Sequence, residues 1–389
     1  MIRELDCKSS GIAALAAVAL LLVLGMCAPA VAGTLPDDRA DVLFHSYEGG
    51  GVTVQGPSIL VRKKFAGKFS ASAKYYQDRV SSASIDVVTT ASPYTEERTE
   101  TSLGLDYLHE GSMMSLQLTN SVESDYVAHT FSLGVSQDLF GDLTTVSLGY
   151  SYGDNRVGRR GDPTFSAKMQ SQNYRLGLSQ ILTKNLLMGL SFEAITDEGF
   201  LNNPYRSIRY LDSGSPLGYS FAPEIYPRTH SSDAAAIRLR YYLPYRAAIH
   251  GSYREYSDTW DIAAQTYELG YTHPLASGWV LEASLRFYSQ TRASFYSDLF
   301  PGPQFQNFMA RDKELAAFTS RGIRVGITYD VIRGGWRFIN RGTLNLVFDH
   351  IKFDYADFRD LRQRGVPPGS EPLYAYDANV VQFFASFWF

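Results

Sequence analysis

The pair of side chains most like a catalytic pair is His250 and Ser252, two positions apart in the stretch "HGS". In an extended segment, residues two positions apart point to the same face, which would bring an imidazole near a serine hydroxyl. A serine nucleophile also needs a base that a third group holds in place, and the sequence shows no evident carboxylate for that role. We therefore expect no enzymatic activity, with a hydrolase that uses this pair as a remote alternative.

Metal and cofactor chemistry has little support in the sequence. The seven histidines are scattered, without an HExxH motif or an i, i+4 pair, and no glycine-rich phosphate loop is present. The cysteines are Cys7 and Cys27, and both precede a predicted cleavage point after Ala32. Cleavage there leaves no thiol for a disulfide, a CxxC redox centre or a zinc site. We expect no cofactor.

Carboxylates gather around one connecting segment, within residues 75–100. Several oxygen ligands close together suit a hard divalent cation, but Arg79, Arg98 and Arg156 are interleaved and can neutralise them. We favour an ion-paired, solvated rim and leave a metal as an open alternative. The acidic residues expected on this extracellular rim are Asp78, Asp86, Glu96, Glu97, Glu100, Glu123, Asp125 and Asp154.

Strands rather than helices must position these groups, because strict alternation recurs along the chain. "TFSLGVSQ" (130–137) and "TVSLGYSYG" (145–153) place large apolar residues on one face and serine or glycine on the other. A soluble barrel turns its apolar face inward and needs large residues there. A membrane barrel turns that face to lipid and leaves small or charged residues in a wet lumen, which is the pattern found here.

The connections give an independent indication of fold. Tight turns near residues 66, 110, 141, 184, 244, 277 and 334 alternate with other, mostly longer connections. Outer-membrane barrels have short periplasmic turns and longer extracellular loops. The sequence predicts an all-β transmembrane antiparallel barrel of about 16 strands. If "EGGGVTVQGP" (48–57) is an internal kink rather than a turn, the count falls to 14.

Alternation also assigns the charged residues that face the lumen. Both signs occur among them, so partial pairing across neighbouring strands is expected. Their functional interpretation is a selectivity lining for a polar or anionic solute, and their purely structural one is a network that holds the lumen together. The candidates are Lys74, Asp106, Arg175, Glu193, Arg238, Arg240, Glu268, Glu282, Arg286, Arg324 and Asp349. The long aromatic stretches 200–230 and 290–318 are expected to constrict the lumen rather than to stack on sugar rings.

Composition and the N-terminal segment agree with secretion. Residues 1–32 read as a signal peptide, with an apolar run and small residues before the cleavage point, which leaves 33–389 as a single barrel domain. The chain has 26 Tyr and 23 Phe, residues that favour strands and membrane interfaces. Its formal net charge of −4 argues against general nucleic-acid binding.

Two stretches resemble a known family of bacterial envelope proteins, the domain of unknown function 3570 family. They are residues 50–100, with "GPSILVRK", "YYQD" and "SSASIDVVTTASPYTEERTE", and residues 253–271, "YREYSDTWDIAAQTYELGY". The resemblance implies an outer-membrane barrel without an assigned ligand. Members are sometimes grouped with small periplasmic redox proteins, which implies an alternative role in electron traffic, although this sequence has no haem, thiol or flavin site.

The last strand and the whole pattern lead to one expectation about location and two about function. "VVQFFASFWF" resembles a barrel-assembly signal, carried by Phe383, Phe387 and Phe389. We expect a protein of the outer membrane that contacts lipid and the barrel-assembly machinery, in an oligomeric state left open. It is either a channel for small polar solutes or, as the alternative, a loop-plugged scaffold barrel that serves a periplasmic partner, with electron transfer across the outer membrane as one such role.

Overall fold

The structure, a computed structural model, describes residues 33–82, 94–363 and 365–389. Its barrel strands are β1 (Arg39–Gly49), β2 (Val52–Phe65), β3 (Phe69–Ser82), β4 (Tyr94–His109), β5 (Ser112–Val122), β6 (Tyr126–Leu139), β7 (Thr144–Val157), β8 (Ala167–Thr183), β9 (Leu186–Gly199), β12 (Thr229–Tyr242), β13 (Ala248–Asp258), β14 (Ala263–Pro274), β15 (Trp279–Gln290), β16 (Phe318–Ile332), β17 (Arg341–Arg359) and β18 (Leu373–Trp388). The predicted signal peptide lies outside the described residues. No helix within the described ranges is long and apolar enough to span a membrane.

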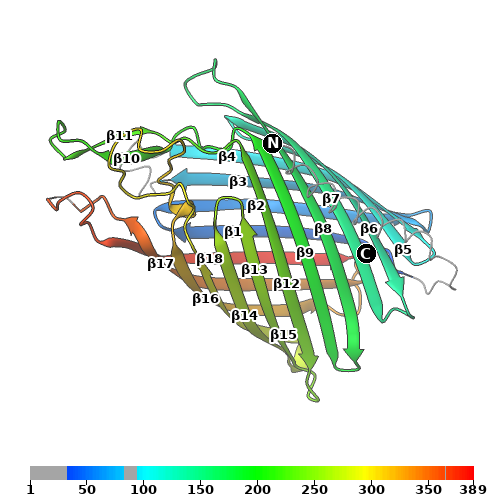
Figure 1. Ribbon diagram of the computed structural model, residues 1–389. Coiled ribbons are helices and arrows are strands. Elements are labelled where there is room, and N and C mark those ends of the chain that lie inside the picture. The colour runs from blue at the N-terminus through cyan, green and yellow to red at the C-terminus, as the bar shows by residue number, and fades with distance from the viewer. Residues whose placement is uncertain (1–32, 83–93, 364) are drawn as a thin grey trace.

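These sixteen strands form a closed antiparallel barrel in which each strand pairs with its sequence neighbours and β18 pairs with β1 (Figure 1). The prediction of 16 strands is confirmed, and the alternative of 14 is wrong. Gly50 and Gly51 have φ of 59° and 80°, a left-handed conformation that glycine adopts without strain, and they form the turn between β1 and β2. The stretch 48–57 is therefore a hairpin.

The two faces of the wall differ as the alternation predicts. On β6 and β7, Ser132 lies opposite Ser151 on the inner face, and their hydroxyl oxygens are 2.9 Å apart. The next residue, Leu133, lies opposite Tyr150 on the outer face. Leu103 of β4 is 63% exposed, although it is a leucine in the middle of a strand. Such an exposed apolar surface, repeated on neighbouring strands, is the surface that lipid covers.

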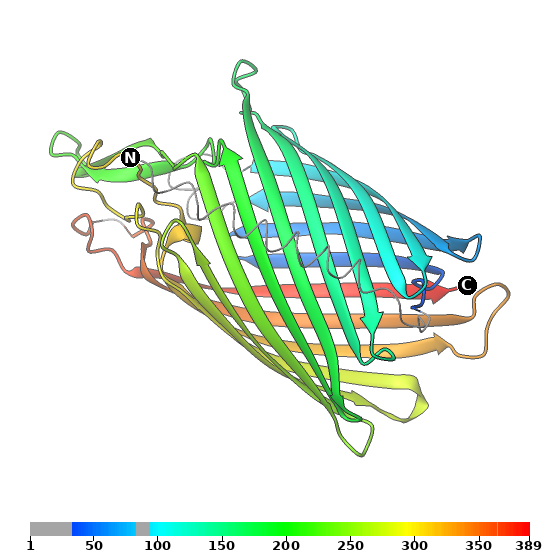
Figure 2. The same cartoon turned by 45° about the vertical axis from the view of Figure 1, so that its right-hand side comes forward.

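The two ends of the barrel carry different connections. The strand pairs β2–β3, β4–β5, β6–β7 and β8–β9 meet in turns of two to four residues, and β1 begins beside the end of β18 at this same end (Figure 2). The opposite end carries the long connection 200–228, which contains β10 (Ser207–Leu211) and β11 (Tyr219–Pro223), and the connection 291–317. By the rule for outer-membrane barrels, the first end is periplasmic and the second extracellular.

The hydrophobic core lies at the extracellular end. Residues 200–228 and 291–317, which we call the loop plug, pack against aromatic residues of the inner wall. Phe295 and Tyr226 of the plug belong to one buried cluster with Tyr355 of β17 and Tyr374 of β18. Rings in this cluster contact edge to face, as Tyr226 does with Phe295 at 5.3 Å between centroids.

Candidate functional site: the basic wall of the lumen and the loop plug

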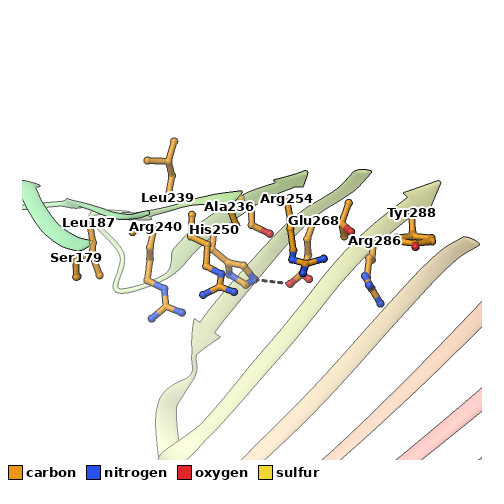
Figure 3. Close-up of a pocket in the computed structure, with 15 residues that line it drawn as sticks. Ser179, Leu187, Ala236, Leu239, Arg240, His250, Arg254, Glu268, Arg286 and Tyr288 are labelled. Atoms are coloured by element: carbon orange, nitrogen blue, oxygen red, sulfur yellow. Dashed lines mark ion pairs between the residues drawn. The ribbon is translucent and has the colours of Figure 1, made fainter. Parts of the chain in front are cut away.

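The inner faces of β12, β13 and β15 carry a group of arginines that we call the basic wall. It comprises Arg238, Arg240, Arg254 and Arg286. They line a cavity of about 800 Å³ together with Glu268 of β14 (Figure 3). The alternation of the strand positions them, since Arg240 points into the cavity while its neighbour Leu239 points to the opposite face of the sheet. The wall is thus a direct result of the two-residue period.

The register of the strands brings distant residues into one row. Arg238 lies opposite Ser252, Ser252 opposite Glu268, and Glu268 opposite Arg286. The row therefore places two arginines and one glutamate across four strands. Arg240 lies two residues further toward the periplasm, directly opposite His250.

The cavity has an excess of positive charge. Its lining contains four arginines and one glutamate. One of these arginines, Arg254, is partly neutralised, because its Nη2 lies 3.8 Å from Oε2 of Glu193. Glu268 lies 3.8 Å from His250, measured between Oε1 and Nε2. Within the described part of the chain, Arg238, Arg240 and Arg286 form no ion pair. Unpaired arginines in a confined space create a strong local attraction for anions.

A second cavity of about 250 Å³ borders the first and shares Glu268 and Arg286 with it. Here Arg324 of β16 is paired, because its Nε lies 2.6 Å from Oδ1 of Asp349 and its Nη2 lies 3.1 Å from Oδ2. This bidentate pair is geometrically strong and leaves little positive charge free. The unpaired charge is thus concentrated on β12 and β15.

The register places all eleven predicted lumen residues on the inner face. Arg175 pairs with Glu193 at 2.9 Å, and Lys74 pairs with Glu100 at 3.1 Å, so pairing across neighbouring strands is found as expected. Asp106 and Glu282 have no ion-pair partner within 4.0 Å among the described residues. The inner face of β5 to β7 carries mainly small polar residues and glycine, for example Gly134 and Ser151.

The predicted acidic rim is not one cluster in the structure, because β3 and β4 extend far enough to include four of its eight residues. Because side chains alternate along β4, Glu97 faces outward while Glu96 faces inward. Glu97 accepts a hydrogen bond from the side-chain amide of Gln77 on β3. Asp78 faces inward and contacts Arg98 at 2.9 Å and His45 at 2.8 Å. These contacts agree with an ion-paired rim.

The other rim residues are also divided. Glu96 lies 3.9 Å from Arg160 on the inner side, whereas Asp154 is on the outer face opposite His129. Asp125 accepts a hydrogen bond from Tyr205 of the loop plug, and Glu123 adjoins the turn between β5 and β6. Asp86 lies outside the described residues. Among those described, no group of three or more His, Cys, Asp or Glu side chains is arranged to hold a metal ion.

The His250–Ser252 pair does face the lumen, and a carboxylate lies nearby that the sequence did not reveal. Nε2 of His250 lies 3.8 Å from Oε1 of Glu268, and no hydrogen bond joins His250 to Ser252 among the described residues. The geometry therefore does not assemble a nucleophile, a base and an orienting acid.

Buried arginines form ion pairs that join the loop plug to the neighbouring connections. Arg209 of β10 is fully buried and forms ion pairs with Glu371, in the loop between β17 and β18, and with Asp298 at 3.6 Å. Arg311 also contacts Asp298, at 2.8 Å, and Arg206 pairs with Asp312. Removing one partner of such a buried pair is costly, since the other charge is left uncompensated.

A buried carboxyl adjoins this network. Glu224, between β11 and β12, accepts a hydrogen bond from the backbone N–H of Arg311 at 2.7 Å. Burial, together with the nearby carboxylate of Asp312, raises the pKa of Glu224 to about 7. The same environment raises the pKa of the Tyr226 hydroxyl, so that it stays protonated. The Glu224 carboxyl thus changes charge near neutral pH.

The three terminal phenylalanines lie on β18 or directly after it. Phe383 and Phe387 are on the outer face, opposite Phe44 and Ala40 of β1. The backbone N–H of Phe389 donates to the carbonyl of Asp38 at 3.3 Å, so the end of the chain takes part in barrel closure. Their predicted role as an assembly signal stays a prediction.

Sequence reasoning missed Arg254 and the buried ion pairs of the plug, although it named the two stretches that form the plug. Arg254 alternates with Ser252 and His250, so the same two-residue period marks it. Arg209, Asp298 and Glu371 have no such signal, because they come from three separate connections and meet only in the folded structure.

A closed barrel with an apolar exterior, a polar interior and short turns at one end defines an outer-membrane β-barrel protein. Comparison of the sequence with protein families is more specific. The model for the family described as "Protein of unknown function (DUF3570)" matches residues 85–341. The chain belongs to this family, as the resemblance in residues 50–100 and 253–271 predicts. No curated protein matches the sequence.

Several solved barrels are similar to this chain at low identity. A bacterial polysaccharide outer membrane secretin has 8% identity and a TM-score of 0.49, over 91% of this chain and 100% of the other. A Pseudomonas aeruginosa FadL homologue has 8% identity and a TM-score of 0.44, covering 91% of each chain. OmpT of Vibrio cholerae has 9% identity and a TM-score of 0.43, over 91% of this chain and 97% of the other.

Proposed function

We propose that this protein is an outer-membrane channel for small polar solutes with a preference for anions. The observation that carries the proposal is the group of unpaired arginines, Arg238, Arg240 and Arg286, in a cavity of about 800 Å³. Buried or confined charges that serve only structure are normally paired. Cations that have no protein partner and face a polar lumen instead attract anions from solution.

The loop plug sets the entrance of this channel. Its aromatic residues pack on the inner faces of β17 and β18 and narrow the lumen from the extracellular side. The serine and glycine side of the wall, on β5 to β7, adds little bulk and leaves space in the lumen. Solutes would pass between the plug and this wall and then along the basic wall.

The test is conductance in planar bilayers with the purified, refolded protein under a KCl gradient. We expect channels whose reversal potential shows a preference for chloride over potassium. The triple variant Arg238→Gln, Arg240→Gln and Arg286→Gln should lose that preference. Arg321→Gln is the matched control, since Arg321 of β16 lies opposite Phe287 on the outer face. Absence of conductance from correctly folded protein would refute the channel.

The plug also supports a second candidate, a closed scaffold barrel for a periplasmic partner. Its buried ion pairs, such as that of Arg209 with Glu371, favour a rigid closed entrance. The scaffold predicts no conductance at any voltage in the wild-type protein, and retained barrel assembly. Any electron-transfer role would then depend on a carrier that the partner brings.

A further inference from the structure

We propose that the basic wall is a binding site for small multivalent oxyanions, of the phosphate or carboxylate type. This inference rests on the proposed function and names the solute class of the same site. It is carried by three observations: the chemical type of the cations, the absence of an ion pair at Arg238, Arg240 and Arg286 among the described residues, and the spacing of the arginines along the lumen. The fourth arginine, Arg254, lies 3.8 Å from Glu193.

Every full cation of the cavity is an arginine, and none is a lysine. A guanidinium group is planar and presents several N–H donors in a fixed fork, which matches two oxygens of a carboxylate or phosphate. A lysine is a point charge that attracts chloride and oxyanions with less discrimination. The composition of the wall therefore favours oxygen-bearing anions over halides.

Arg286 is free for a ligand although a carboxylate lies directly opposite it. Glu268 is its register partner on β14, but their charged groups are not within ion-pair distance. Glu268 is near His250 instead, and Arg286 extends away from both (Figure 3). A structural pair would close this gap, as Arg324 and Asp349 do with a bidentate contact.

The arginines occupy successive levels along the barrel. Arg254 is nearest the extracellular end, Arg238 and Arg286 share the next row, and Arg240 is two residues below Arg238. Two residues of a strand correspond to about 7 Å. An oxyanion that leaves one guanidinium thus meets the next within about 7 Å, and several moderate sites in series permit both binding and release.

Binding is measured directly by titration calorimetry on the folded, detergent-solubilised protein. The probes are inorganic phosphate and succinate, each against a background of sodium chloride at matched ionic strength. We expect saturable binding of at least one oxyanion, above the response to chloride. The Arg286→Gln variant lacks one guanidinium that can donate charge-assisted hydrogen bonds, and its affinity for the oxyanion should be roughly tenfold lower.

A charge-conserving variant separates the oxyanion site from general attraction. Arg286→Lys should weaken oxyanion binding while the chloride preference in bilayers is retained. Arg321→Gln, on the outer face, should change neither. Folding of each variant is checked by its gel mobility before and after boiling, so that loss of binding is not confused with loss of the barrel.

The outcomes distinguish this inference from the proposed function. Oxyanion binding without conductance would support the site and refute the channel. Conductance with chloride preference but no oxyanion binding above chloride would overturn the site and leave the channel intact. An affinity unchanged in both Arg286 variants would also overturn it. Preference for phosphate or for succinate identifies which oxyanion the wall accepts.

Discussion

At the scale of single residues, Glu224 shows how burial sets a charge in the loop plug. The groups that face it are Asp312, the backbone N–H of Arg311, Arg206 and Tyr226. Burial is the larger cause and the nearby charge of Asp312 the second, and together they raise the pKa of Glu224 from 4.5 to about 7. The pKa of Glu224 is higher in the folded protein than in the unfolded chain. The contribution of Glu224 to the stability of the folded protein is therefore fully present below pH 4.5 and is lost as the pH rises through about 7.

The first prediction is therefore a plug that loosens as the pH rises. Between pH 5.5 and 8, Glu224 becomes a buried carboxylate beside Asp312, and the open probability of single channels should increase. The Glu224→Gln variant should keep the low open probability of pH 5.5 over the whole range up to pH 8. Glu314→Gln, at an exposed carboxyl of the other plug connection, 291–317, should keep the wild-type response. An identical pH response in Glu224→Gln would show that this residue is not its source.

At the scale of elements, the plug consists of two connections that are held together by backbone pairing. Ile225 and Met309 form an antiparallel bridge. The backbone nitrogen of Ile225 lies 3.0 Å from the carbonyl oxygen of Met309, and that of Met309 lies 2.8 Å from the carbonyl oxygen of Ile225. Arg209 and Phe300 add a further backbone hydrogen bond at 2.8 Å. Opening the extracellular end requires these two connections to separate or to move as one body.

A reversible crosslink tests which motion occurs. A hydrogen-bonded antiparallel pair has Cα atoms about 5.5 Å apart, within the range of a disulfide. The sequence has no cysteine after Cys27, so Ile225→Cys with Met309→Cys should form one defined bridge. We expect the oxidised variant to lose most of its conductance and to recover it with reductant. Equal conductance in both states would mean that the connections move together or that the solute path bypasses their junction.

The strands were predictable from the sequence, whereas the contacts within the plug were not. A period of two depends only on local residues, so "TFSLGVSQ" already assigns Leu133 to lipid and Ser132 to the lumen. The same reasoning places Arg238 and Arg286 inside. Which arginines are paired depends on register and on side-chain direction, and neither is visible in the sequence. The contact of Arg209 with Glu371 spans 162 positions and follows no period.

At the scale of the whole molecule, the barrel separates two environments that differ sharply for a charge. Its outer face is an apolar band that includes Leu133, which is 47% exposed at the middle of β6. Its inner face is polar, and Ser136 of the same strand lies opposite Ser147 on the serine and glycine wall. The same chemical change on β6 should therefore have opposite consequences at positions three residues apart.

The prediction compares Leu133→Arg with Ser136→Arg in urea titrations of the protein folded into lipid vesicles. An arginine at the lipid midplane costs about 2–4 kcal/mol of folding free energy, because its charge must be brought out of water. At Ser136 the guanidinium stays in the aqueous lumen, where charged groups are hydrated. We expect a large loss of stability only for Leu133→Arg. A large loss in both variants would mean that this wall is packed rather than wet, and a small loss in both would argue that lipid does not cover the outer face of β6.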